Sequence, residues 1–353
     1  MLFDDPAMYS QLDPQDMRGE IARLPDQLAE AQALSRALPL PAWTGLTRVV
    51  IAGMGGSAIG ADLLAAHALP DCRVPVFVHR DYGLPGWAAG PETLVIASSH
   101  SGNTEETLSA FEAALAAGCR VLAVCTGGRL AAAAEQAGIP VWRFVHAGQP
   151  RAAVGFSFGL LLGAFERLGL LPNQGAEIEG ALEALRGQGA SLAPEVPAVA
   201  NPAKRYAGQL MGRSFTVFGA EFLGPVARRW KGQVNELAKS WAQFEILPEA
   251  DHNALAGTVH PESLTMSSFA MFLTSPLQHP RNRLRMELTR RAYMLEGVST
   301  DFYEAHGAGR LAQQWTALQF ADYVSYYLAL ACGVDPTPVA ALEAFKEEMA
   351  GTQ

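Results

Sequence analysis

The sequence of 353 residues has few charged side chains and no apolar run long enough to span a membrane. Charged residues make up 17% of the chain, and the net charge is -9. Binding to nucleic acid depends on clustered Lys and Arg, so this balance argues against a nucleic acid partner. We therefore expect neither nucleic acid nor a membrane as a partner. A small anionic ligand would be bound by local basic side chains and backbone N–H groups.

Cysteine is also scarce, with four residues at positions 72, 119, 125 and 332. They lie in apolar or strand-like segments without metal-ligand spacing, so we expect buried thiols rather than a zinc site or disulfides. No other cluster of His, Glu and Cys has zinc-ligand spacing, and we expect no metal and no cofactor. The first residues lack the basic segment of a secretory signal, which leads us to expect a cytoplasmic protein.

Strand and helix signals alternate twice along the chain. Such alternation is typical of parallel strands joined by crossover helices, and it predicts an α/β fold with two similar units. The predicted strands are 48–52, 74–78, 93–97, 120–125 and 141–144 in the first unit, and 215–220, 244–247, 268–273 and 299–303 in the second. The predicted divisions are a helical arm at 1–40, a first domain at 41–175, a linker at 176–202, a second domain at 203–335 and a C-terminal helix at 336–353.

A loop of hydroxyl side chains follows the apolar run 93–97. A helix is predicted to open at Asn103 or Thr104, with Glu106 closing a capping box on Asn103. The free N–H groups and positive dipole at the start of such a helix favour an anion, so the loop is a candidate phosphate cradle. An ordinary capped loop is the alternative, because Ser, Gly, Asn and Thr are common in turns. The candidate phosphate-binding residues here are Ser99, Ser101 and Thr104.

A second loop of this kind follows the predicted strand 48–52. Its glycines permit positive φ and close approach of a ligand to the backbone. The pattern Gly53-x-Gly55-x-x-Ala58 also fits a dinucleotide-binding fingerprint, but no acidic residue ends the next strand, which leads to His79. Two hydroxyl-bearing loops at neighbouring strand ends instead suggest one small phosphorylated ligand, held from both sides. The candidate residues of this loop are Gly55, Gly56 and Ser57.

Taken in order, several motifs resemble the bifunctional phosphoglucose/phosphomannose isomerase family. They lie at 53–60, 99–107, 150–153, 235–239, 248–253, 322–327 and 333–336, so the resemblance covers nearly the whole chain. It implies two sugar isomerase (SIS) domains, each a mostly parallel sheet flanked by helices. It also implies an enzyme that interconverts glucose 6-phosphate and mannose 6-phosphate with fructose 6-phosphate through a cis-enediolate.

The resemblance assigns two residues to the proton transfer itself. Glu236 matches the family's base, and Arg151 matches the residue that stabilises the enediolate. From the residues alone, a surface carboxylate paired with Lys239 at helical spacing is the favoured interpretation of Glu236, and only the resemblance reverses it. A lone Arg before a helix is, in the same way, most often solvated.

Two further residues match the family's ring-opening groups. His252 has a side chain that titrates near neutrality, and it is similar to a histidine that the neighbouring subunit delivers in this family, which implies a homodimer. Lys346 matches a lysine beside that site, although a solvated lysine on an amphipathic helix is the alternative. Thr337 is a possible match for the family's specificity residue, and His100 in the serine loop departs from closer family patterns.

Two other function classes stay open from the residues. A noncatalytic SIS-type sensor of sugar phosphates would explain both loops but would give Glu236 and His252 no task. A nucleotide-binding oxidoreductase would explain only the first glycine loop. The resemblance favours the isomerase, whose chemistry uses all of these residues.

Overall fold

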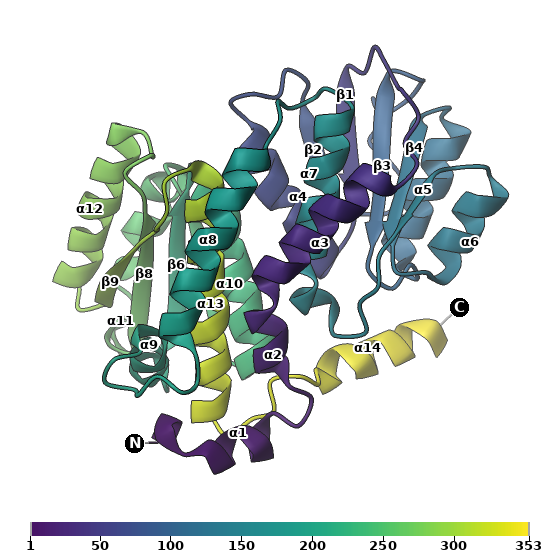
Figure 1. Ribbon diagram of the computed structural model, residues 1–353. Helices are drawn as coiled ribbons and strands as arrows, with labels where there is room; N and C mark the ends of the chain where they lie inside the picture. Colours follow the sequence, from purple (N-terminus) through teal and green to yellow (C-terminus); the bar gives the residue numbers. More distant parts are fainter. Residues whose placement is uncertain (1, 352–353) are drawn as a thin grey trace.

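Two separate parallel sheets, each flanked by helices, organise the chain in the computed structural model, which describes residues 2–351 (Figure 1). The first sheet has the strand order β2-β1-β3-β4-β5 and the second has the order β7-β6-β8-β9. The strands of the first sheet are β1 (Arg48–Ala52), β2 (Val76–His79), β3 (Thr93–Ser99), β4 (Arg120–Cys125) and β5 (Val141–Arg143). Those of the second are β6 (Ser214–Ala220), β7 (Ala242–Leu247), β8 (Ser268–Thr274) and β9 (Ser299–Glu304). The predicted fold class is confirmed, with two sheets of parallel strands.

Successive residues of the strands enter different hydrophobic cores, because side chains alternate across a sheet. In β1, Val49 and Ile51 point into one core while Val50 points into another. Helices α4 (Gly55–Ala68) and α7 (Val154–Arg167) cover the first face, and α5 (Glu105–Ala116) and α6 (Gly128–Gln136) cover the second. Burial on both faces explains the uninterrupted apolar run of β3. The strand ends in two serines, which lead into the second loop.

The second sheet is covered in the same way. On its inner face lie α9 (Pro202–Leu210), α10 (Gly224–Ala238) and α13 (Arg310–Ala331), and on its outer face lies α12 (Pro280–Leu295). Helix α13 is buried over nearly its whole length, which fits its central place in Figure 1. The inner faces of both sheets share one core, and α4 of the first half packs against α10 of the second. This contact brings the start of α4 and the C-terminal half of α10 to one site.

The N-terminal residues form three helices, α1 (Pro6–Leu12), α2 (Met17–Ala22) and α3 (Leu24–Ala37). Helix α3 packs closely on α7, where glycines at every fourth position leave room for it. A Cβ atom at Gly163 would lie only 2.1 Å from the Ser35 hydroxyl oxygen. The helical arm is therefore anchored on the first domain.

The segment expected as a linker contains a helix, α8 (Gly175–Leu192). Its buried residues Ile178, Ala181 and Leu185 recur at helical spacing and face α3 and α13. Short helices complete the described chain: α11 (Glu262–Met266), the 3-10 helices η1 (Leu2–Asp4), η2 (Pro150–Ala152), η3 (Glu221–Leu223), η4 (Glu249–His252) and η5 (Ala254–Thr258), and the C-terminal α14 (Ala340–Gly351).

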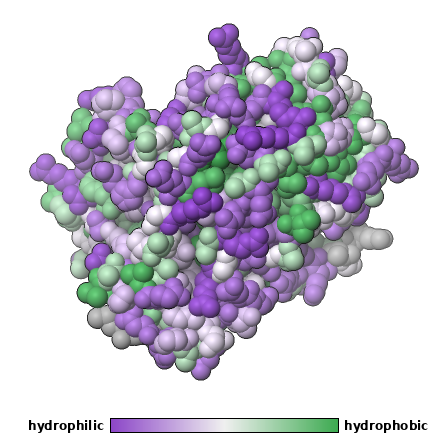
Figure 2. All heavy atoms as spheres, viewed as in Figure 1, coloured by the Kyte–Doolittle hydropathy of each residue, from purple (hydrophilic) through white to green (hydrophobic). Residues whose placement is uncertain are grey.

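Helix α14 extends away from the end of α13, beneath the first domain in Figure 1. The side chains of residues 341–349 are all exposed. On the face seen in Figure 2, hydrophilic residues surround scattered hydrophobic areas. Within residues 2–351, no helix has the length and apolar character needed to cross a membrane.

Candidate active site

The two candidate phosphate loops meet at the carboxyl edge of the first sheet. The loop after β1 leads into α4, whose N-terminus has no side-chain cap, so the backbone N–H groups of Gly55 and Gly56 are available to a ligand. Gly55 has a φ of +48°, a conformation that side chains rarely adopt. A Cβ atom at Gly56 would lie 2.5 Å from the carbonyl oxygen of Pro150, so glycine at this position lets the Arg151 loop approach.

Hydrogen bonds connect the second loop to the first. The backbone N–H of His100 donates to the Ser57 hydroxyl oxygen at 3.0 Å. The Ser99 hydroxyl lies 2.9 Å from that of Thr104 and accepts from the N–H of Gly102 at 3.1 Å. Ser57 and Ser99 are buried, whereas Ser101 is exposed. The predicted phosphate-binding hydroxyls therefore lie around one edge of the sheet.

The predicted capping box on α5 was wrong. Helix α5 starts at Glu105 after an N-cap at Thr104, and this cap makes no side-chain hydrogen bond. The Asn103 amide oxygen instead accepts from the backbone N–H of Arg129 at 3.0 Å. Because Asn103 is used to join two loops, the N–H groups at the start of α5 stay free for a ligand.

Arg151 and Glu236 lie at the contact between the two halves. Nη1 of Arg151 is 3.5 Å from Oε2 of Glu236, and the Arg151 side chain is 4% exposed against 33% for Glu236. The Nη2 atom of Arg151 donates to the carbonyl oxygens of Pro336, at 2.8 Å, and Thr337. Its Nε is buried and has no hydrogen-bond partner in the described chain. The Arg151 guanidinium is thus held in place, while its Nε–H donor stays unpaired among the described residues.

The surface pairing that sequence spacing allowed for Glu236 is not what the structure shows. Lys239 ends α10 in a left-handed conformation and donates to the carbonyl oxygens of Leu237, at 3.1 Å, and Asp335, at 2.6 Å. Glu236 faces Arg151 and a cavity of about 300 Å³ between the halves. A half-exposed carboxylate at such a cavity can reach a bound ligand.

Basic side chains dominate the wall of this cavity. Arg80, directly after β2, and Arg228, on α10, share the carboxylate of Asp62 on α4. Lys231 also lines the cavity, and within residues 2–351 no ion pair involves it. The cavity therefore favours an anionic ligand although the whole chain carries a charge of -9.

A buried ion pair between Arg229 and Asp322 contacts the backbone of the Arg151 loop. Arg229 makes two hydrogen bonds to Asp322 of α13, of 3.1 Å and 2.7 Å, and also donates to the carbonyl oxygen of Arg151 at 3.0 Å. Gln233 donates to the same carboxylate at 2.9 Å. Two-pronged pairing of this kind fixes orientation as well as distance.

Burial lowers the pKa of Arg151 from its ordinary value, and the charge of Glu236 opposes this shift. The guanidinium nevertheless stays protonated near neutral pH, because arginine is not deprotonated in proteins. Burial, followed by the charge of Arg151, lowers the pKa of Lys239. A permanent positive charge therefore stands beside Glu236.

Two predicted residues are not brought to this cavity within the chain. His252, in η4 after β7, is exposed, and Lys346, on α14, is exposed as well. Neither lines the cavity. Thr337, in contrast, lies against Arg151, and its buried hydroxyl has no partner among the described residues.

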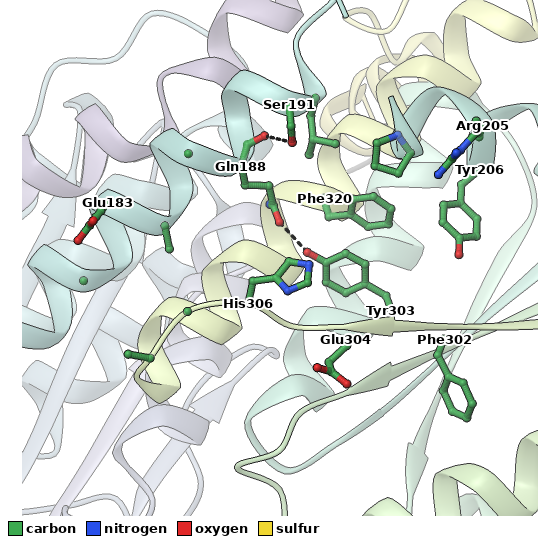
Figure 3. Close-up of a pocket in the computed structure, with 17 residues that line it drawn as sticks. Glu183, Gln188, Ser191, Arg205, Tyr206, Phe302, Tyr303, Glu304, His306 and Phe320 are labelled. Carbon is green, nitrogen blue, oxygen red and sulfur yellow. Dashed lines mark hydrogen bonds between the residues drawn. The ribbon is translucent and has the colours of Figure 1, made fainter. Parts of the chain in front are cut away.

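A larger cavity of about 810 Å³ lies elsewhere, between α8, α9, β9 and α13 (Figure 3). The Tyr303 hydroxyl points at Gln188 and lies 2.7 Å from its Oε1 atom, and the Tyr206 hydroxyl donates to Asp301 at 2.6 Å. Several buried side-chain N and O atoms of the described chain have no hydrogen-bond partner, but none of them belongs to a residue that lines this cavity. The larger cavity thus offers no unused buried donor to a ligand, in contrast to the Arg151 site.

Sequence reasoning missed the basic wall formed by Arg80, Arg228 and Lys231. For Arg80 a signal was present, because a residue directly after a parallel strand lies at the same edge as the phosphate loops. For Arg228 and Lys231 the signal was weaker. They precede Glu236 by eight and five residues on one helix, so they share a side of it only in part.

Solved structures share this fold. A glucose-6-phosphate isomerase like protein from Thermus thermophilus aligns with a TM-score of 0.62 and 21% identity, covering 96% of this chain and 99% of its own. Tagatose-6-phosphate ketose/aldose isomerase from Escherichia coli aligns with a TM-score of 0.69 and 17% identity, covering 90% of this chain and 93% of its own. Residues 199–349 match the family model described as the bacterial phospho-glucose isomerase C-terminal SIS domain. Together, the fold and this match define an SIS-domain protein.

Sequence relatives define the family more narrowly. A bifunctional phosphoglucose/phosphomannose isomerase from Caldicellulosiruptor bescii is 38% identical over 334 residues, which is 94% of this chain and 98% of the relative. Another from Aquifex aeolicus is 34% identical over 302 residues, which is 85% of this chain and 90% of the relative. The chain belongs to the bifunctional phosphoglucose/phosphomannose isomerase family, so the resemblance drawn from its motifs is confirmed.

Proposed function

We propose that this protein is an aldose-ketose isomerase that interconverts glucose 6-phosphate and mannose 6-phosphate with fructose 6-phosphate. The observation that carries the proposal is the Glu236 carboxylate, 3.5 Å from a buried guanidinium and facing a cationic cavity. Relatives that align over nearly the full chain bear names for both activities. A noncatalytic sensor would need the hydroxyl loops but not this carboxylate.

Glu236 would act as the base that moves a proton between C1 and C2. It takes the proton from one carbon to form a cis-enediolate, and its carboxylic acid returns that proton to the other carbon. Rotation of the bound substrate about the C2–C3 bond would present either epimer's proton to the same carboxylate. This proton transfer requires neither a metal nor a redox cofactor.

Arg151 would stabilise the negative charge that develops on the enediolate oxygens. Its side chain is held by two carbonyl oxygens, so little reorganisation is needed when the charge appears. The nearby Thr337 hydroxyl lacks a partner in the described chain and is our candidate for the residue that sets specificity between the two epimers.

The phosphate group would be held by the two hydroxyl loops. Dianion binding would use the side chains and the free N–H groups at the starts of α4 and α5, where the helix dipoles favour negative charge. The residues proposed for this role are Gly55, Gly56, Ser57, Ser99, Ser101 and Thr104. Three of them carry buried or half-buried hydroxyl groups that are already oriented by hydrogen bonds.

Ring opening would use His252 and Lys346, and this part of the proposal needs a homodimer. His252 is exposed and lies away from the cavity of its own chain, as expected if it serves the neighbouring subunit. Helix α14 also carries three exposed apolar side chains on one side, Leu342, Phe345 and Met349. A surface of this kind suits contact with a second copy. The expected cytoplasmic location stays a prediction.

Incubating the purified, EDTA-treated protein with fructose 6-phosphate tests the reaction. We expect both glucose 6-phosphate and mannose 6-phosphate to form, each followed by its own coupled assay. Formation of only one product would restrict the activity to one epimer. Binding of fructose 6-phosphate without turnover would overturn the isomerase and favour a sensor.

A further inference from the structure

Two imidazoles and a carboxylate form a hydrogen-bonded chain behind the phosphate loops. Nε2 of His100 lies 3.0 Å from Nδ1 of His146, and Nε2 of His146 lies 3.0 Å from Oε2 of Glu20. His146 follows β5 and its side chain is 6% exposed, while Glu20 is on α2 of the N-terminal arm and is 24% exposed. The chain therefore spans three segments that are far apart in the sequence. None of the proposed catalytic steps uses it.

With His146 neutral, hydrogen-bond chemistry fixes the direction of every donor among Glu20, His146 and His100. The Glu20 carboxylate can only accept, so Nε2 of His146 carries a proton and donates to it. In the neutral imidazole, Nδ1 of His146 then accepts, and Nε2 of His100 must donate. Burial is the main cause that lowers the pKa of His100 to about 4, and a protonated His146 would lower it further, so the His100 ring is neutral near neutral pH. One tautomer assignment satisfies all three groups.

The backbone of His100 connects this chain to both phosphate loops. Its N–H donates to the hydroxyl of Ser57, and its carbonyl oxygen accepts from the N–H and hydroxyl of Thr126, at 3.0 Å and 2.7 Å. Ser99 and Ser101 flank it in the sequence. A shift of the His100 backbone would therefore displace the hydroxyl groups on either side.

The same chain lies against the segment that leads to Arg151. A Cβ atom at Gly148 would lie 2.9 Å from the His146 ring and 3.0 Å from a Glu20 oxygen. In the same segment, Gln27 of α3 donates to the carbonyl oxygen of Ala152 at 2.8 Å. The N-terminal arm thus contacts the Arg151 loop from two helices.

We propose that Glu20, His146 and His100 are positioning residues that hold the phosphate loops in their binding geometry. The proposal rests on the proposed function for the identity of the ligand. Glu20 acts through the imidazole rings of His146 and His100. Its contribution is a carboxylate oxygen at a fixed position, which accepts the hydrogen bond from His146. Loss of that acceptor lets His146 and His100 change tautomer and orientation, and the affinity for a phosphorylated ligand falls.

Glu20→Ala and Glu20→Gln separate the acceptor from the charge. We expect Glu20→Ala to raise the KM for fructose 6-phosphate and the Ki of inorganic phosphate about tenfold, with kcat changed less than threefold. Glu20→Gln retains an oxygen that accepts from His146, so both constants should stay within threefold of wild type. Glu30→Ala is the matched control, since Glu30 is an exposed carboxylate of the same arm. It should leave both constants unchanged.

A double-mutant cycle with His100→Ala tests whether the residues act as one chain. His100 is only partly buried, so this variant keeps the proposal testable if Glu20→Ala does not fold. We expect His100→Ala to raise both constants as Glu20→Ala does, and the double variant to be no worse than the worse single variant. Multiplicative effects, equal losses in Glu20→Gln and Glu20→Ala, or unchanged constants in folded Glu20→Ala would each overturn the proposal.

Calorimetric binding separates this inference from the proposed function. If the wild-type protein binds fructose 6-phosphate without turnover, the isomerase fails, but the affinities of the same variants still test the positioning chain. If turnover is normal and Glu20→Ala binds phosphate as wild type does, the positioning role of Glu20, His146 and His100 is refuted. The proposed isomerase activity is then retained.

Discussion

The Nη1 atom of Arg151 lies 3.5 Å from Oε2 of Glu236, although 85 residues separate them and each belongs to a different half of the chain. Contact between α4 and α10 makes this approach possible, because α4 opens beside the Arg151 loop and α10 carries Glu236. The site thus depends on the packing of both halves on one shared core.

Glu236→Gln tests the role of the carboxylate. The amide has the same shape but cannot accept the substrate proton, so we expect kcat to fall by about 100-fold to 10,000-fold. Binding of fructose 6-phosphate, measured by calorimetry, should be retained. The control is Glu112→Gln, an exposed carboxylate of α5. Unimpaired turnover in Glu236→Gln would remove Glu236 from the mechanism.

Much of the fold and part of this site could be predicted because their signals are local. Strands and loops are encoded in runs of adjacent residues, and β3 followed by its serines is an example. The Asp62 carboxylate shared by Arg80 and Arg228 could not be predicted, since it depends on how two helices and a strand end meet in space. The segment of helix α8 was predicted to be a linker because it is rich in glycine and glutamate, although its buried residues recur at helical spacing.

Ser99→Ala tests the phosphate loop. Ser99 is buried and its hydroxyl contacts both Thr104 and the N–H of Gly102, so its loss affects the loop as well as one contact. A hydrogen bond to a charged group contributes about 1.5–3 kcal/mol, so the KM should rise roughly 10-fold to 100-fold. Steady-state kinetics should show a smaller change in kcat. Ser191→Ala, at the larger cavity, should behave as wild type.

Mixing two inactive variants tests the shared active site. Glu236→Gln and His252→Ala homodimers should each be inactive, whereas a mixed dimer has one site with both intact groups. After random exchange of subunits, activity should recover to about a quarter of wild type, because half of the dimers are mixed and each has one working site. Subunit exchange is followed by energy transfer between labelled chains. Exchange without recovered activity would refute a shared site.

Acid should destabilise the protein partly through His100. Its pKa is lowered to about 4 in the folded chain, below the ordinary value of 6.5, so the unfolded chain binds more protons between these values. Stability is therefore lost as the pH falls through this window. Between pH 7 and pH 4.5 the loss from this residue is about 2 kcal/mol, discounted because the ring is partly solvated. Urea denaturation should show a smaller loss in His100→Gln.

Gly56→Ala tests whether close contact between the first phosphate loop and the Arg151 loop is needed for turnover. The added Cβ would lie 2.5 Å from the carbonyl oxygen of Pro150, a backbone atom that must move together with its neighbour Arg151. A displacement of about 1 Å at a catalytic group lowers rates by roughly 100-fold, so we expect kcat to fall by that order. The matched control is Gly180→Ala on α8, where a new Cβ meets nothing within 4 Å. That variant should keep wild-type activity and gain about 0.5–1 kcal/mol of stability, because alanine favours a helix interior over glycine. Normal kcat in a folded Gly56→Ala protein would show that the Arg151 loop tolerates displacement, and catalysis would not depend on this contact.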